Sequence, residues 1–221
     1  MEVVVYVSHV DDDVLGAGGL IPQLVEKEHD VKIVYATDGL LHPPKQVDNR
    51  PKAERSATIL GVDPSEVYFL GFPNQRFDGD PLIELNRGFE GLDLKPDLLI
   101  TNAETDVNQD HRHVFESALI VGRSIDRQVG IMTCEVQGSS EWNSEPFNPN
   151  FYVDISETIE RKIDAMEEID TELEDWPHPR SRRGIEVKAR QRGMEVGVDY
   201  AEAFRIIRWF DFDDSLTNAS V

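Results

Sequence analysis

The sequence contains one cysteine, Cys134, among its 221 residues. One cysteine cannot form an internal disulfide, and it excludes the thiolate-rich sites in which several cysteines hold zinc. Any metal that the chain binds must therefore rest on histidine and carboxylate side chains. Cys134 lies in an apolar run, where a lone cysteine is usually a small buried residue.

Long apolar runs are missing as well. No stretch approaches the roughly 20 apolar residues that cross a bilayer, so we expect no integral membrane segment. The opening residues, MEVVVYVSH, have no basic region, no separate apolar region and no small-residue cleavage site of a secretory signal. The expected location is therefore cytoplasmic.

Positive charge is scarce. The 22 Lys and Arg residues stand against 43 Asp and Glu residues, which gives a net charge of −21. This excess opposes attraction to nucleic acids and anionic membranes, so we expect no nucleic acid partner. An acidic surface also suits a salt-rich cytoplasm, because about 1 M salt shortens the range of electrostatic repulsion, the Debye length, to about 3 Å. A halophilic host is a hypothesis that full stability at low KCl would contradict.

Short apolar runs give the main sign of regular structure. Five of them are predicted to be strands, at residues 3–7, 31–36, 67–70, 98–101 and 131–135. Helical patterns follow the first strand and cover Arg50–Leu60, which ends at Gly61, and residues 111–123. This alternation predicts an α/β fold, a Rossmann-like three-layer sandwich with a mostly parallel sheet and helices on both faces.

The pattern weakens in the C-terminal third. A polar loop is expected over residues 138–150, a charged helix over 155–173 and a short strand over 204–207, with the rest irregular. No internal repeat or low-complexity segment divides the chain. A single domain over residues 1–221 is the simplest organisation.

The segment Ser8-His9-Val10-Asp11-Asp12-Asp13 directly follows the first predicted strand. Ligands of α/β sheets gather at the carboxyl ends of the strands. Three consecutive carboxylates repel one another unless a cation or hydrogen-bond donors compensate the charge. One interpretation is that these aspartates only cap the helix that follows, and His9 favours a site instead.

A second polar cluster, DVNQDHRH at residues 106–113, follows the strand predicted at 98–101. His9, Asp12 and His111 would supply three ligands and leave a fourth position for water, the pattern of catalytic zinc. Zinc lowers the pKa of such a water to about 7, and a free carboxylate beside it can accept the proton. The alternative is a magnesium-dependent phosphoryl-transfer enzyme that uses Asp11 to Asp13.

These two segments resemble the signatures of the LmbE-like, or PIG-L, family of zinc N-deacetylases. Residues 9–13 are similar to its His-Pro-Asp-Asp-Glu signature, with Val10 in place of Pro and Asp13 in place of Glu, and residues 106–112 are similar to its second motif. Arg50 and Glu54 resemble a helix of the family. Further similarities to its sugar-biosynthesis branch follow in order along the chain, at residues 135–142, 177–181 and 200–204.

The resemblance implies roles for individual positions. His9, Asp12 and His111 would hold zinc, and Asp11 would be the general base that activates the water. Asp110 would support a ligand or a charged intermediate. Each of these residues stands at the matching position of a family motif.

Other implied positions concern the substrate and the acid. Some relatives carry a histidine three residues before the second zinc-binding histidine, where this chain has Asn108, which donates hydrogen bonds but no proton at neutral pH. Either another residue supplies the acid or Asp11 does both jobs. Arg50 would contact the substrate or departing acetate. His178 would act as acid or sugar contact, and Trp142 would either stack on a sugar or pack within its loop.

The expected protein is thus a zinc-dependent hydrolase that removes an N-acetyl group from an N-acetylglucosamine-type sugar or sugar conjugate. Alternatives are an amidase acting on another amide conjugate, such as a thiol-sugar, the magnesium-dependent enzyme above, and a sugar-binding protein without catalysis. The resemblance also implies a homo-oligomer. The amino-sugar substrate and Zn²⁺ are the expected partner and cofactor.

Overall fold

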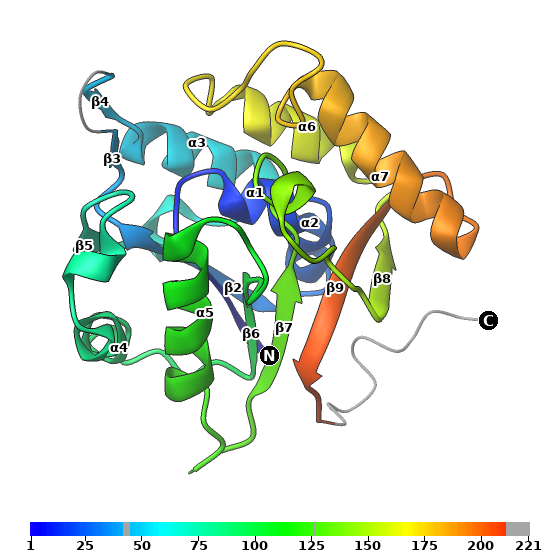
Figure 1. Ribbon diagram of the computed structural model, residues 1–221. Helices are drawn as coiled ribbons and strands as arrows, with labels where there is room; N and C mark the ends of the chain where they lie inside the picture. Colours follow the sequence, from blue (N-terminus) through cyan, green and yellow to red (C-terminus); the bar gives the residue numbers. More distant parts are fainter. Residues whose placement is uncertain (42–44, 126, 211–221) are drawn as a thin grey trace.

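The computed structural model describes residues 1–41, 45–125 and 127–210 of the chain. Its centre is a seven-stranded sheet with the order β5-β2-β1-β6-β7-β9-β8 (Figure 1). β5, β2, β1, β6 and β7 run parallel, and β9 pairs antiparallel with both β7 and β8. The strands are β1 (Glu2–Val7), β2 (Asp30–Thr37), β5 (Val67–Phe72), β6 (Leu98–Asn102), β7 (Gly130–Cys134), β8 (Phe151–Asp154) and β9 (Ala201–Arg208).

Helices cover both faces of this sheet, which confirms the predicted three-layer α/β sandwich. One face carries α1 (Asp12–Ala17), α2 (Leu20–Glu26), α3 (Arg50–Leu60), α6 (Ile159–Glu167) and α7 (Arg182–Val196), and the other carries α4 (Leu82–Glu90) and α5 (Gln109–Val121) (Figure 1). The short elements are β3 (Leu40–Leu41), β4 (Val47–Asp48) and the 3-10 turns η1 (Pro64–Glu66), η2 (Phe77–Gly79) and η3 (Ser140–Trp142). No helix among the described residues is long and apolar enough to cross a membrane.

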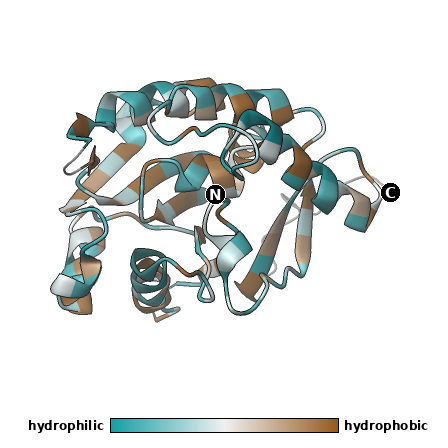
Figure 2. Ribbon diagram, turned by 45° about the horizontal axis from the view of Figure 1, so that its top comes forward, coloured by the Kyte–Doolittle hydropathy of each residue, from teal (hydrophilic) through white to brown (hydrophobic). Residues whose placement is uncertain are grey.

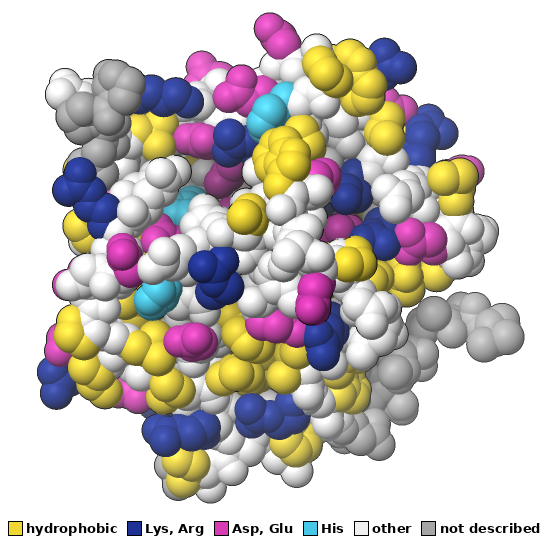
Figure 3. All heavy atoms as spheres, viewed as in Figure 1, with side chains coloured by type: hydrophobic (Ala, Val, Ile, Leu, Met, Phe, Trp, Pro, Cys, Tyr) yellow, Lys and Arg dark blue, Asp and Glu magenta, His cyan; other side chains and the backbone are white. Residues whose placement is uncertain are grey.

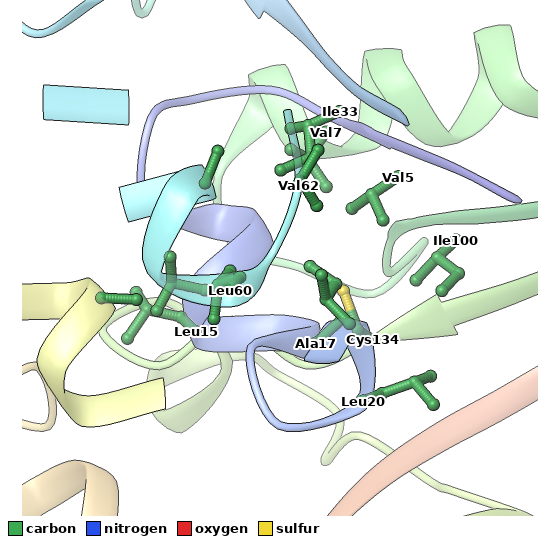
Figure 4. Close-up of a cluster of buried hydrophobic side chains, with 14 of the residues drawn as sticks. Val5, Val7, Leu15, Ala17, Leu20, Ile33, Leu60, Val62, Ile100 and Cys134 are labelled. Carbon is green, nitrogen blue, oxygen red and sulfur yellow. The ribbon is translucent and has the colours of Figure 1, made fainter. Parts of the chain in front are cut away.

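The core lies on both sides of β1, because successive side chains of a strand point to opposite faces. Val5 and Val7 belong to the cluster beneath α1, α2 and α3, whereas Val4 and Tyr6 pack against α4 and α5. Figure 4 shows Val5 and Val7 in the first cluster, together with Leu60. Hydrophobic residues run along the strands, while the helices alternate hydrophobic and hydrophilic residues (Figure 2). The short apolar run at the start of the chain is therefore a fully buried strand, as predicted.

The helix predicted after β1 is divided into α1 and α2. A Cβ atom on Gly19 would lie 2.6 Å from Ile155, so the chain passes too close to its neighbours there for a side chain. The backbone N–H groups of Gly19 and Leu20 donate to the carboxylate of Glu202, at 2.7 and 2.8 Å. A side chain of β9 thus supplies the acceptors at the start of α2, a contact that the local pattern does not reveal.

The C-terminal third is more regular than expected. The charged helix spans Ile159–Glu167, shorter than the predicted 155–173, and α7 forms where no helix was predicted. The buried positions of α7 combine Ile185 and Ala189 with Gly184, Arg192 and Gly193, so its inward face has only a weak form of the apolar stripe that marks a helix in a sequence. The strand predicted at 204–207 extends over all of β9, and β8 pairs with it at the edge of the sheet.

Candidate metal centre

The ends of two neighbouring strands bring the two polar segments together. β1 and β6 are parallel neighbours, so the residues after Val7 and the residues after Asn102 leave the sheet at the same edge. The N–H and hydroxyl groups of Ser8 donate to Oδ1 of Asn102, at 2.9 and 3.0 Å. Nδ2 of Asn102 in turn donates to Oδ2 of Asp12, at 3.1 Å. Asn102, which the sequence did not single out, therefore fixes the Asp12 carboxylate.

Three donor atoms converge at this edge. Nδ1 of His9 lies 3.2 Å from Nε2 of His111, and Oδ2 of Asp12 lies 3.7 and 3.4 Å from the same two nitrogens. Tetrahedral zinc with bonds of about 2.0–2.1 Å separates its ligand atoms by roughly 3.3–3.4 Å. The side chains of Asp12 and His111 are only 2% exposed. The three predicted ligands thus form a buried triangle whose size fits one zinc ion. Among the described residues, they are the group of histidine and carboxylate side chains that could hold a metal.

Each histidine turns its other ring nitrogen toward a carboxylate. Nε2 of His9 lies 3.0 Å from Oδ2 of Asp110, and Nδ1 of His111 lies 3.1 Å from Oδ2 of Asp106. The backbone N–H of Gln75 donates to Asp110 at 2.7 Å, which anchors this carboxylate to the loop after β5. Such partners fix the orientation of a metal-binding imidazole and raise its basicity. Sequence reasoning missed Asp106, although it stands within the recognised second motif.

Charge at the site favours cations. Burial lowers the pKa of His111, but the charges of Asp12 and Asp106 outweigh this effect and raise it to about 9. Burial raises the pKa of Asp11 well above its usual range, and the neighbouring charges of Asp12 and Glu172 add to the shift. Both shifts have the sign expected for a cluster of carboxylates without a compensating cation. A divalent cation is the species that such a cluster suits.

Asp11 lies beside the donor triangle. It is the residue before α1, has a φ angle of 131°, and makes no side-chain hydrogen bond to the helix N-terminus. Its Oδ2 atom instead accepts a hydrogen bond from Nη1 of Arg180, at 3.2 Å. The same Nη1 atom donates to Oε2 of Glu172, at 3.0 Å. Sequence reasoning missed these two partners, although Arg180 stands in a segment that the resemblance marks.

A polar cavity of about 560 Å³ opens over these residues. His9, Asp11, Asp12 and His111 line it, and the additional lining side chains include Asn49, Asn74, Gln75, Asn108, Gln137, Ser139, Glu172 and Arg180. On the face in Figure 3, histidine, acidic and basic side chains gather around a hollow in the upper left part. The size and polarity of the cavity suit a small polyhydroxylated molecule.

Of the other predicted site residues, one lines the cavity and three lie outside its lining. Asn108 lines the cavity, and its Oδ1 accepts from the N–H of Asp110 at 3.0 Å at the start of α5. Arg50 does not line the cavity, because its exposed guanidinium binds Asp48. Trp142 and His178 also lie outside the lining: the indole is 57% exposed, and the two rings are 5.8 Å apart.

Comparison with models of protein families shows which family the chain belongs to. The model of the PIG-L family, described as GlcNAc-PI de-N-acetylase, matches residues 4–121, more than half of the chain. The chain belongs to the PIG-L family. The matched residues include the whole donor triangle, whereas Glu172 and Arg180 lie beyond them.

Solved structures share the fold over nearly the whole length. A conserved protein of Thermus thermophilus is 22% identical, with a TM-score of 0.75 over 95% of this chain and 96% of the other. The N,N'-diacetylchitobiose deacetylase of Pyrococcus horikoshii is 21% identical, with a TM-score of 0.72 over 96% and 88%. The 4-carboxy-2-hydroxymuconate hydratase of Pseudomonas putida is 19% identical, with a TM-score of 0.70 over 97% and 99%. Because deacetylases and a hydratase share the fold, the function must be argued from the site.

Proposed function

We propose that this member of the PIG-L family is a zinc-dependent amidohydrolase that removes the N-acetyl group of an N-acetylglucosamine-type sugar or sugar conjugate. The observation that carries the proposal is the donor triangle of His9, Asp12 and His111 with the carboxylate of Asp11 beside it, all lining one polar cavity. The de-N-acetylase description of the family and the deacetylase among the similar structures support the acetyl group as the part removed.

The donor set favours zinc over magnesium. Two of its three atoms are imidazole nitrogens, which suit zinc, whereas magnesium prefers oxygen ligands and usually keeps several waters. A zinc ion held here would polarise the acetyl carbonyl and lower the pKa of a water to about 7. A magnesium-dependent phosphoryl-transfer enzyme would not need His9 and His111 as metal ligands. The same geometry therefore argues against that alternative.

The chain's own side chains would move the protons. Two carboxylates line the cavity outside the donor triangle, Asp11 and Glu172. Asp11 directly precedes the ligand Asp12, whereas Glu172 is held on the far side of Arg180, so Asp11 would accept the proton of the attacking water. Among the described lining residues, both histidines are proposed ligands and Asn108 carries no acidic proton at neutral pH. Asp11, which carries the proton of the water after that step, would then return it to the departing amine.

Asn108 and Asp110 would support this chemistry without transferring a proton. Oδ1 of Asn108 is occupied by the N–H of Asp110, which leaves its Nδ2 group to donate a hydrogen bond to the oxyanion that forms on the acetyl carbon. Asp110 would hold the ring of His9 in place. Arg50, Trp142 and His178 stay candidates for contacts with parts of a substrate that extend beyond the cavity.

The test is acetate release from a panel of N-acetylated amino sugars by the zinc-loaded protein. We expect release by the wild type, and the loss of one proton acceptor in Asp11→Asn or of one ligand in His111→Ala should abolish most of it. Arg87→Ala serves as the control, because Arg87 is exposed and pairs with Glu84 on α4. Equal rates in wild type and Asp11→Asn would contradict the role of Asp11. Release of another acyl group with none of acetate would support the alternative amide conjugates.

A further inference from the structure

The side chain of Asp11 is turned away from its ordinary partner. An aspartate directly before a helix usually accepts a hydrogen bond from the second or third N–H group of that helix. Asp11 makes no such bond, and its φ angle of 131° lies in a region that residues other than glycine rarely adopt. Something other than the local sequence must hold the carboxylate toward the cavity.

Arg180 makes the contact that does so. Its Nη1 atom donates to Oδ2 of Asp11 at 3.2 Å, across 169 positions of the chain. The guanidinium is itself held from the other side by Oε2 of Glu172, at 3.0 Å. The Asp11 carboxylate is 6% exposed, and both partners line the cavity. The three side chains therefore form a row along its wall.

The backbone around Arg180 is shaped to accommodate this row. Gly138 has a φ angle of +88°, and a Cβ atom there would lie 3.0 Å from both Cγ and Cδ of Arg180. The aliphatic part of Arg180 thus passes directly over Gly138, in the loop that follows β7. Pro179 and Ser181 flank it, and Ser181 begins α7 by accepting the N–H of Gly184 at 3.0 Å.

We infer that Arg180 is a positioning residue for the proposed deacetylation: it pulls the Asp11 carboxylate off the start of α1 and holds it beside the donor triangle. Glu172 holds the guanidinium from the other side and so fixes it in contact with Asp11. The inference rests on the proposed function for the role of Asp11. It assigns part of the site to the C-terminal segment, which lies beyond the residues that the family model matches.

The structural test is a crystal structure of Arg180→Met. Methionine keeps an aliphatic side chain over Gly138 but has no guanidinium. We expect the Asp11 side chain to rotate and accept the backbone N–H of Asp13 or Val14, as a helix cap does. An Asp11 carboxylate that stays in its wild-type position would overturn the inference. This readout needs no substrate, so it decides the inference even if the deacetylase proposal fails.

The kinetic test separates positioning from folding. A displaced general base lowers the rate of the chemical step, so Arg180→Met should lose about 10²-fold in kcat, with KM changed by less than about threefold. Bound zinc per chain should stay at the wild-type value, which shows that the variant folds and keeps the donor triangle. Arg180→Lys, which keeps a cation near both carboxylates, should recover part of the loss. Arg87→Ala is the matched control for removing an arginine from an ion pair.

Two results would contradict a positioning role. A rise in KM with unchanged kcat would instead make Arg180 a substrate contact, since it would then act on binding alone. A kcat of Arg180→Lys that is as low as that of Arg180→Met, together with an unmoved Asp11, would remove any role of the cation. If Arg180→Met does not fold, the crystal structure of Arg180→Lys decides instead: a lysine that makes no contact with Asp11, while the carboxylate still faces the cavity, would overturn the inference. A lysine that still contacts Asp11, with the carboxylate facing the cavity, supports the inference.

Discussion

Lys162 forms a buried ion pair with Glu202 outside the site. Its Nζ atom donates to Oε1 of Glu202 at 2.6 Å and to the carbonyl of Leu15 at 2.8 Å. Both charged side chains are only 4% exposed. Because Glu202 also accepts the N–H groups at the start of α2, Lys162→Met would leave a buried carboxylate without its cation beneath the helices that follow the site.

The expected cost follows from this burial. Removing one partner of a buried ion pair destabilises a protein by about 3–5 kcal/mol. For a chain of this size each kcal/mol lowers Tm by about 2–4 °C, so Lys162→Met should lower Tm by about 6–20 °C. The measurement is thermal unfolding followed by circular dichroism at fixed pH and salt.

Lys95→Met is the matched control, because Lys95 pairs with Asp93 at the surface, where the two side chains are 64% and 85% exposed. Such a pair is screened by solvent and contributes at most about 1 kcal/mol, so the control should lower Tm by no more than about 4 °C. Equal shifts in the two variants would refute the reasoning. A stable Lys162→Met protein would show that Glu202 is neutralised in another way.

Three further predictions concern the metal and the core. Asp110→Asn removes the acceptor that orients His9, so zinc affinity should fall by about 10–100-fold in a competition assay with a chromophoric chelator, and an unchanged affinity would contradict this. The pKa of His111 is raised to about 9, and its imidazole must lose a proton to bind, so affinity should fall about tenfold per pH unit below that value. A flat profile over about pH 6–8 would refute this prediction. Gly16→Ala would place a Cβ atom 2.3 Å from Sγ of Cys134 and should lower the free energy of unfolding by about 1–3 kcal/mol. This loss of stability should be smaller in the double variant with Cys134→Ala, which removes the sulfur atom. Additive effects of the two substitutions would contradict the clash.

The elements that the sequence predicted well are those with a strong local signal. The apolar run of β1 and the pattern of α3 ending at Gly61, which has a φ angle of 91°, both formed as expected. The division between α1 and α2 depends on Glu202, which is distant in sequence. The pattern of α7 is weak because glycine and arginine share its buried face with only two apolar residues, Ile185 and Ala189. Local periodicity cannot report contacts of this kind.

The site shows the same limit. The rule that strand ends of a parallel sheet share one edge was enough to expect that His9, Asp12 and His111 converge. Arg180 reaches Asp11 from the C-terminal third, and neither spacing nor composition indicates that contact. The position of Arg50 was likewise not evident from the sequence. A local partner, Asp48, holds its guanidinium outside the cavity, and only the folded chain reveals this.

The proposed hydrolase activity requires one zinc ion on His9, Asp12 and His111. The most direct measurement is acetate release during titration of the metal-free protein with zinc, using a substrate from the panel above. We expect the rate to rise until about one zinc is bound per chain, and we expect His111→Ala not to respond over the same range. A full rate in metal-free protein, or an equal response of His111→Ala, would contradict this requirement.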